Sequence, residues 1–283
     1  MRSRGVAEYA RLDFNVASWN IHSAIGRDGR YHPERVAQLI DQMDLDLVGL
    51  QEVSLSGSYA DEALLQTLSP TFAYWHFVPT HVQYPRYRSN RPAGFGNLLL
   101  SRWPICIHNH LDLSFMHHEP RCKLVCEVAT PVGNLWVWVT HFGLRYQERK
   151  RQANWVAAAL AQLDPQTPLL LMGDFNDWMP GTPSLRALRS SLGRPATRRT
   201  FPAAFPVFAL DQFWVHGPLC VRKIQAVKEN GIGLASDHLP LRGVLQLTLP
   251  HKAVADKRAE RPDKDKGFCN PEVNRQQWVP GFN

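Results

Sequence analysis

The sequence predicts one α/β domain in which helices cover mixed β-sheets. Three observations lead to this prediction: strands alternate with amphipathic helices early in the chain, closely linked strands follow in the middle, and no linker divides the body. A chain of 283 residues that is 44% hydrophobic has enough apolar side chains for one large core. We therefore expect an extension at 1–12, a single domain at 13–249 and a polar, flexible tail at 250–283.

The first part of the chain alternates strands with helices. Residues 14–19 and 45–50 are short apolar runs typical of buried strands. Between them, residues 33–43 place Val36, Leu39, Ile40 and Met43 at the i, i+3, i+4, i+7 spacing of one helix face, and Pro33 suits a first helical turn. A second helix is expected at about 60–68, and a strand at 74–78.

A long segment at 80–96, THVQYPRYRSNRPAGFG, then interrupts the regular elements between Pro and Gly turn signals. Its arginines interleave with tyrosines, and Arg side chains bind phosphate in a forked geometry. We expect this loop to contact an anionic substrate, with a solvated basic loop as the alternative. The arginines concerned are Arg86, Arg88 and Arg91.

The middle of the chain predicts an antiparallel sheet portion. Strands are expected at 97–101, 105–113, 123–129 and 135–140, and the short segment TPVGN predicts a hairpin between the last two. A helix at 145–163 and a strand at 168–172 follow. The remaining elements are a helix near 184–190 and strands at 210–215, 220–227 and 241–247.

Composition limits the classes of protein and partner. The formal charge of +7 suits an anionic partner. No run approaches the roughly 18 apolar residues of a membrane helix, and the N-terminus lacks a signal-peptide core, so we expect a cytoplasmic monomer. Peripheral contact with the inner membrane face is kept open. The five cysteines are widely spread without a Cys-x-x-Cys pair, which favours free thiols.

Polar side chains suited to metal-assisted chemistry flank many of these strands. Carboxylates and carboxamides are hard oxygen ligands for Mg²⁺ or Mn²⁺, and histidines transfer protons near neutral pH. Active sites of layered α/β proteins form at the carboxyl ends of strands, which predicts one site for phosphoryl chemistry. Taken singly, each residue also suits a cap or a turn. In chain order they are Asn20, His22, Glu52, His141, Asp174, Asn176, Asp211, Asp237 and His238.

Seven stretches around these residues occur in a characteristic order: ASWNIH (17–22), LVGLQEV (47–53), GNLLLSRWPI (96–105), VTHFGL (139–144), LLLMGDFND (169–177), ALDQFWV (209–215) and SDHLPL (236–241). With them the chain resembles the endonuclease/exonuclease/phosphatase superfamily, which includes DNase I-like nucleases, apurinic endonucleases, neutral sphingomyelinases and inositol polyphosphate phosphatases. The resemblance spans about residues 13–248. It implies a four-layer α/β sandwich, in which two packed mixed sheets are flanked by helices and the active site lies at one sheet edge.

Two further stretches, HFGLRYQERKRQ (141–152) and GRPATRRTFPAAFP (193–206), resemble a bacterial branch of metal-dependent hydrolases. That branch is related to the soluble domain of eukaryotic proteins associated with GPI-anchor lipid remodelling. The superfamily motifs are a strong indication of the chemistry. This second resemblance is a weaker indication of the substrate.

The resemblance implies roles for the metal and phosphate ligands. Glu52 is expected to be the principal Mg²⁺ ligand, with Mn²⁺ as an alternative ion, and Asn20 to lie beside it. Asp237 is expected to bind the metal or a histidine. His141 matches the histidine that stabilises the charged transition state, and Asn176 matches a residue that holds the phosphate.

The resemblance also implies the groups that handle the attacking water. Asp174 is expected to orient it, Asp211 to fix the tautomer of a histidine, and His238 to act as general base. Whether His238 or Asp174 takes the proton stays open. Arg145 follows the His141 motif closely enough to bind substrate.

The predicted function is a Mg²⁺-dependent phosphodiesterase that hydrolyses a phospholipid-type headgroup or a nucleic acid by in-line attack of water. Two alternatives are kept: a phosphomonoesterase acting on a small phosphorylated metabolite, and a catalytically silent relative that binds an anion or a membrane. A silent relative predicts damage to at least one required position, and none of the matched positions is altered.

Overall fold

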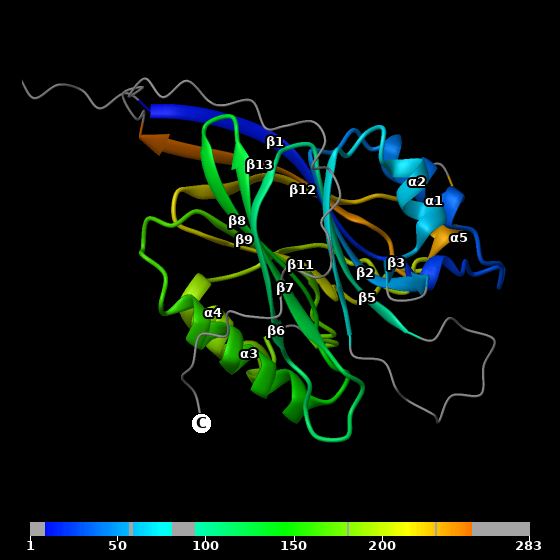
Figure 1. Cartoon of the computed structure of the whole chain (residues 1–283). Coiled ribbons are helices and arrows are strands. Elements are labelled where there is room, and N and C mark those ends of the chain that lie inside the picture. The colour runs from blue at the N-terminus through cyan, green and yellow to red at the C-terminus, as the bar shows by residue number, and fades with distance from the viewer. Residues whose placement is uncertain (1–8, 57–58, 81–93, 180, 230, 251–283) are drawn as a thin grey trace, which may run out of the picture. The chain divides into compact units, whose positions relative to one another are not determined.

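Two β-sheets pack face to face at the centre of the protein, with helices on both outer faces (Figure 1). The computed structural model describes residues 9–56, 59–80, 94–179, 181–229 and 231–250. Three apolar clusters separate the four layers. Val137 and Leu245 belong to the cluster between the sheets, Ile40 to the cluster under the helices of the first sheet, and Val156 to the cluster under those of the second. The predicted four-layer sandwich is confirmed.

The first sheet contains the first and last strands of the domain. Its order is β12 (Leu219–Ala226), β13 (Leu241–Pro250), β1 (Tyr9–Asn20), β2 (Leu47–Ser56), β5 (Phe95–Ser101) and β4 (Tyr74–Pro79), with β3 (Tyr59–Ala60) paired to β2. Strands β1 and β2 are parallel, whereas the other pairs are antiparallel.

The second sheet has the order β10 (Ala196–Thr197), β11 (Asp211–His216), β9 (Leu169–Asp174), β8 (Gly133–His141), β7 (Cys122–Thr130) and β6 (Ile105–Asp112). Here β8 and β9 are parallel, and the other pairs are antiparallel. The predicted hairpin between β7 and β8 is confirmed, since Thr130 pairs with Gly133.

The helices form two groups on opposite sides of the sandwich (Figure 1). Helices α1 (Pro33–Asp41), α2 (Glu62–Leu68) and α5 (Ile232–Ala235) cover the first sheet, and α3 (Tyr146–Leu160) and α4 (Arg186–Leu192) cover the second. Short 3-10 turns η1 (His22–Ala24) and η2 (Pro183–Leu185) precede two of them in the chain.

The helix boundaries have local causes. Pro33 occupies the first turn of α1, where a missing N–H costs nothing. The apolar face of α1 is buried, as its residue spacing predicts. Asp61 caps the N-terminus of α2, because its carboxylate accepts a hydrogen bond from the Leu64 N–H at 3.2 Å.

Several boundaries differ from the expectation. Strand β1 begins at Tyr9, so residues 9–12 belong to the sheet and not to an extension. The two-residue strands β3 and β10 and the four-residue α5 were not predicted. Of the predicted tail at 250–283, Pro250 is the last residue of β13, and residues 251–283 lie outside the described residues. Most of the loop at 80–96 also lies outside them.

The cysteines and helices bear on two other expectations. Cys122 and Cys126 are buried free thiols on β7, and Cys106 and Cys220 are exposed free thiols. Cys269 lies outside the described residues. Across the described ranges, no helix combines the length and apolar character needed to cross a membrane.

Candidate active site

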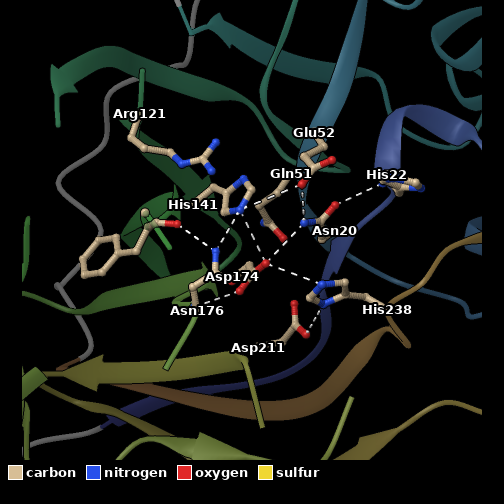
Figure 2. Close-up of polar contacts among 12 residues, drawn as sticks. Asn20, His22, Gln51, Glu52, Arg121, His141, Asp174, Asn176, Asp211 and His238 are labelled. Carbon is tan, nitrogen blue, oxygen red and sulfur yellow. Dashed lines mark hydrogen bonds and ion pairs between the residues drawn. The ribbon is translucent and has the colours of Figure 1, made fainter. Parts of the chain in front are cut away.

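Polar residues from both sheets meet at the edge where β1, β2, β8 and β9 direct their carboxyl ends (Figure 2). In the second sheet, His141, Asp174 and Asp211 form one row across three strands, because each is the register partner of the next. In the first sheet, β1 ends at Asn20, and the parallel β2 brings Glu52 beside it. The fold thus gathers residues that are far apart in the sequence.

Asn20 links the two sheets at this edge. Its Nδ2 donates to Glu52 Oε1 at 3.0 Å and to Asp174 Oδ2 at 3.2 Å, and its Oδ1 accepts the His22 N–H at 3.0 Å. Glu52 lies where the register of β2 with β5 shifts, and its φ is +53°. Such a backbone costs about 1–3 kcal/mol and persists where surrounding structure requires it, often at functional sites.

Asp174 is buried at the end of β9, and Gly173 lets this strand lie close to β8. A Cβ at position 173 would be 1.9 Å from the Thr140 carbonyl oxygen, and the φ of +152° also favours glycine. Asp174 Oδ1 accepts the Asn176 N–H at 2.9 Å. Burial raises the pKa of the Asp174 carboxyl, while the charge of His238 opposes that rise.

His141 is buried beside Asp174. Its Nε2 lies 3.5 Å from Asp174 Oδ2 and 3.9 Å from Glu52 Oε1. Asn176 Nδ2 approaches the same nitrogen at 3.2 Å and donates to the Phe142 carbonyl oxygen at 2.8 Å. Burial lowers the pKa of His141 well below its usual value, and the charges of Arg121 and His238 lower it further.

His238 is held between two carboxylates. Its Nδ1 lies 3.0 Å from Asp211 Oδ2, and its Nε2 lies 3.6 Å from Asp174 Oδ2. The same Asp211 oxygen accepts a hydrogen bond from Thr200 Oγ1 at 2.5 Å. Burial lowers the pKa of His238, but the negative charges of Asp211, Asp174 and Asp237 outweigh burial and raise it to about 10.

Contacts from the first sheet fix the backbone of the His238 loop. Ser236 Oγ donates to the Asn20 carbonyl oxygen at 2.7 Å and accepts the His238 N–H at 3.1 Å. Trp19 Nε1 donates to the His238 carbonyl oxygen at 2.9 Å. The Phe201 ring packs against the imidazole of His238, with 4.8 Å between the ring centroids. His238 therefore has a fixed backbone and a fixed ring plane.

Most of the predicted site residues are brought together, and the others are placed as follows. Asp237 is half-buried and accepts a hydrogen bond from Ser236 Oγ at 3.3 Å, so its role as a metal ligand stays a prediction. Arg145 is exposed directly before α3. The remaining predicted substrate ligands lie outside the described residues: Arg86, Arg88 and Arg91.

Sequence reasoning missed two residues of this site. Thr200 supports the Asp211 carboxylate, and Arg121, only 3% exposed, lies beside His141 (Figure 2). Neither belongs to a stretch that marks a site. Arg121 is a single arginine before an apolar strand, a position that ordinarily predicts a solvated side chain.

The donors of Glu52 and Asn20 fit a hard divalent cation. Glu52 supplies a half-buried carboxylate, and the amide oxygen of Asn20 retains a lone pair beyond the one that accepts the His22 N–H. In the described part of the chain, no three His, Cys, Asp or Glu side chains converge as a metal site. Such a sparse set suits Mg²⁺, which binds through one or two carboxylates and keeps several waters.

Comparison with known proteins supports this reading of the fold. The sequence profile of the endonuclease/exonuclease/phosphatase family matches residues 17–238. YbhP, an uncharacterised protein of Escherichia coli strain K12, is 28% identical over 257 residues, which cover 84% of this chain and 98% of YbhP.

Two solved structures share the fold. An endonuclease/exonuclease/phosphatase of Beutenbergia cavernae has a TM-score of 0.68 at 24% identity, covering 83% of this chain and 72% of its own. A mannosyl-6-phosphatase of Bacteroides thetaiotaomicron has a TM-score of 0.64 at 18% identity, covering 82% of this chain and 99% of its own.

The span matched by the family profile begins within β1 and ends at His238, so it contains every strand end that contributes to the candidate site. This chain therefore belongs to the endonuclease/exonuclease/phosphatase family, whose members are hydrolases of phosphate esters that generally use divalent metal ions.

Proposed function

We propose that the protein is a Mg²⁺-dependent phosphodiesterase that cleaves its substrate by in-line attack of water at phosphorus. The observation that carries this proposal is the placement of His238 between Asp174 and Asp211, opposite the Glu52–Asn20 pair. This arrangement places a group that can take a proton from water, His238, and ligands for a metal ion, Glu52 and Asn20, at one sheet edge.

The position of each residue in the site indicates its role. Asp211 accepts from Nδ1 of His238 and so directs Nε2 toward Asp174 and the interior of the site. When His238 is protonated, Asp174 is the group that receives the proton of the water; when it is neutral, Nε2 of His238 receives it. Glu52 and Asn20 would hold Mg²⁺, which when bound neutralises charge on the phosphate and the leaving oxygen.

His141 and Asn176 form a second pair of polar side chains beside Asp174. The Asn176 amide bonds to the Phe142 carbonyl oxygen and to His141, so both side chains keep one orientation. Fixed polar groups stabilise developing charge without having to reorganise during the reaction. We assign both residues to the phosphate and its charged transition state.

Exposed apolar residues that lie near site residues in the chain support a phospholipid headgroup as the substrate. Leu144 and Tyr146 are 57% and 41% exposed on either side of the exposed Arg145, directly after the His141 motif. Phe205, in the loop after Phe201, is 77% exposed. Exposed apolar side chains next to a cation suit the interface of an anionic membrane, where rings and aliphatic chains enter the headgroup region.

A phosphomonoesterase is the second candidate, and the mannosyl-6-phosphatase that shares the fold supports keeping it in the test. The deciding assay compares Mg²⁺-dependent release of p-nitrophenol from bis(p-nitrophenyl) phosphate and from p-nitrophenyl phosphate. Supercoiled plasmid and phospholipid vesicles are incubated in parallel to distinguish the natural substrate classes.

Glu52→Ala and His238→Ala are the test variants, and Glu62→Ala and His32→Ala, which change exposed residues, are their matched controls. We expect turnover of the diester to require metal, to survive in both controls and to fall at least 100-fold in both test variants. Preference for the monoester would replace the diesterase with a phosphomonoesterase. Folded protein without turnover of any substrate, with Mg²⁺ or Mn²⁺, would favour the catalytically silent relative.

A further inference from the structure

We propose that Gln152 of α3 is a positioning residue for the reaction, because it fixes the peptide group from which Asn176 takes its orientation beside His141. The proposal rests on the proposed function, since it concerns side chains that are assigned there to the charged transition state. It adds no group that touches the substrate. It begins from an amide side chain that lies inside α3 and is 0% exposed.

Both ends of the Gln152 amide bind the backbone of a loop. Oε1 accepts the Gly143 N–H at 2.8 Å, and Nε2 donates to the Leu113 carbonyl oxygen at 2.9 Å. Strands β6 and β8 are both antiparallel to β7, so the loops that follow them leave the sheet at the edge that carries the site. A buried amide is costly unless its donor and its acceptor are both used, and here both are.

The Gly143 N–H belongs to the same peptide group as the Phe142 carbonyl. A peptide group is planar and rigid, so a hydrogen bond that fixes the direction of its N–H also fixes the direction of its C=O. That carbonyl oxygen accepts the 2.8 Å hydrogen bond from Asn176 Nδ2, and the same nitrogen lies 3.2 Å from His141 Nε2. Gln152 and Asn176 therefore bind the two ends of one rigid group.

Gly143 makes this restraint necessary. A Cβ at this position would lie 1.7 Å from Glu148 Cδ, so the close approach of α3 to the loop requires glycine. Glycine also permits backbone dihedral angles that other residues avoid, which lets the peptide group before it rotate more easily. The hydrogen bond from Gly143 to Gln152 opposes that rotation.

The peptide groups on either side are held by other residues. The Phe142 N–H, in the preceding group, donates to the Asp174 carbonyl oxygen at 2.8 Å. The Gly143 carbonyl oxygen, in the following group, accepts a hydrogen bond from Arg149 Nη1 at 3.4 Å. The path of the loop should therefore survive the loss of Gln152, whereas the orientation of one peptide group should not.

Gln152→Leu tests the proposal, because leucine is apolar and forms neither hydrogen bond. With bis(p-nitrophenyl) phosphate and Mg²⁺, kcat should fall about 10-fold to 100-fold with little change in KM, since Asn176 and His141 act on the transition state. Val156→Ala is the matched control, because it leaves a cavity under the same helix but keeps the Gln152 hydrogen bonds. It should lower the midpoint of urea unfolding and leave kcat nearly unchanged.

Two further variants separate positioning from stability. Gln152→Met lacks both hydrogen bonds and repeats the test with a more flexible side chain if Gln152→Leu does not fold. Gln152→Glu is the rescue variant. Burial and the nearby Glu148 carboxylate should keep the new carboxyl protonated, so it supplies an acceptor and a donor as the amide does. Its kcat should therefore recover most of the loss.

A second readout does not depend on turnover. The side-chain NH₂ resonances of Asn176, assigned by their absence in Asn176→Asp, report its hydrogen bond to the Phe142 carbonyl in the metal-free protein. Gln152→Leu should shift them, and Val156→Ala should not. Unmoved resonances, or a kcat loss no larger than that of Val156→Ala, would overturn the positioning role. Shifted resonances in a protein whose wild type turns over no ester would support the restraint and contradict only the proposed function.

Discussion

His141 and His238 both place Nε2 against Oδ2 of Asp174, yet the environments of the two rings shift their pKa values in opposite directions. Both rings are almost fully buried, at 4% and 5% exposure, so burial disfavours the charged form of each to a similar degree. Yet the pKa of His141 is lowered, whereas that of His238 is raised to about 10. The difference shows that the carboxylates around His238 outweigh burial, whereas burial sets the direction of the shift at His141.

The partner of Nδ1 is the main distinction between the two rings. His238 has Asp211 there at 3.0 Å, whereas Nδ1 of His141 has no partner among the described residues and faces Arg121. One site thus combines an imidazole whose pKa is raised by carboxylates and an imidazole whose pKa is lowered by burial. Changing a single neighbour should therefore change the role of either ring.

Asp211→Asn is expected to have the largest effect, because it removes the charge that both orients His238 and favours its protonated form. Diester turnover should fall about 100-fold to 10 000-fold, as when general acid–base catalysis is lost. The pKa of His238, followed by NMR in the metal-free protein, should fall. Asp164→Asn, in the exposed turn after α3, is the control. An unchanged pKa would contradict the comparison even if activity were lost.

Asn176→Asp is expected to make His141 behave more like His238, because it adds a carboxylate close to Nε2. The carboxylates of Asp174 and Glu52 lie farther from this nitrogen, at 3.5 Å and 3.9 Å, than the Asn176 amide at 3.2 Å. The pKa of His141 should rise, because the new negative charge favours the imidazolium. Diester turnover should fall about 100-fold, since a fixed donor near the phosphate becomes a negative charge. Asn134→Asp, on the exposed start of β8, is the control, and a His141 ring that stays neutral in the variant would contradict this explanation.

Lys123 tests the effect of burial without charged neighbours. Burial is the only cause that shifts the pKa of Lys123, and it lowers this pKa to about 7. Between pH 7 and 10 the unfolded chain binds more protons here than the folded chain, so this residue makes stability rise with pH. Lys123→Met should stabilise the protein at pH 7 by on the order of 2 kcal/mol, after allowing for the lost cation–π contact with Trp138.

Urea unfolding at several pH values measures this effect. The advantage of Lys123→Met should shrink as the pH rises from 7 through 10.5, where the lysine of the unfolded chain loses the proton that the folded chain has already released. Lys223→Met, on β12, is the control for the loss of an ordinary lysine. An advantage that does not depend on pH would mean that packing, and not the buried charge, separates the two proteins.

Much of the fold could be predicted because its elements have strong local patterns. Helix α1 carries an apolar stripe at helical spacing, and β9 is an uninterrupted apolar run before Gly173. The start of β1 could not be predicted this way. Its first residues are partly exposed and hydrophilic, and they form a strand because residues 9–18 pair with 241–250. Pairing across such a sequence distance leaves no local signal.

The residues of the candidate site show the same distinction between features with a local sequence signal and features that depend on distant contacts. Residues in motifs at strand ends, such as Asn20 and Asp174, were found because strand ends converge by a general rule. Arg121 was missed, because burial of an isolated cation depends on which elements cover it. Which imidazole is charged was also unpredictable, since it depends on the cross-strand register that sets Asp211 beside Asp174.

The pairing of β1 with β13 has a consequence for biosynthesis. A ribosome releases β1 first, but its antiparallel neighbour consists of residues 241–250, which are made last in this domain. Until then one edge of β1 has no β13 to pair with, and His238, three residues before that strand begins at Leu241, has only just been synthesised. A nascent chain therefore carries Glu52 and Asn20 long before it can assemble the site, so hydrolysis should begin only once the domain is complete.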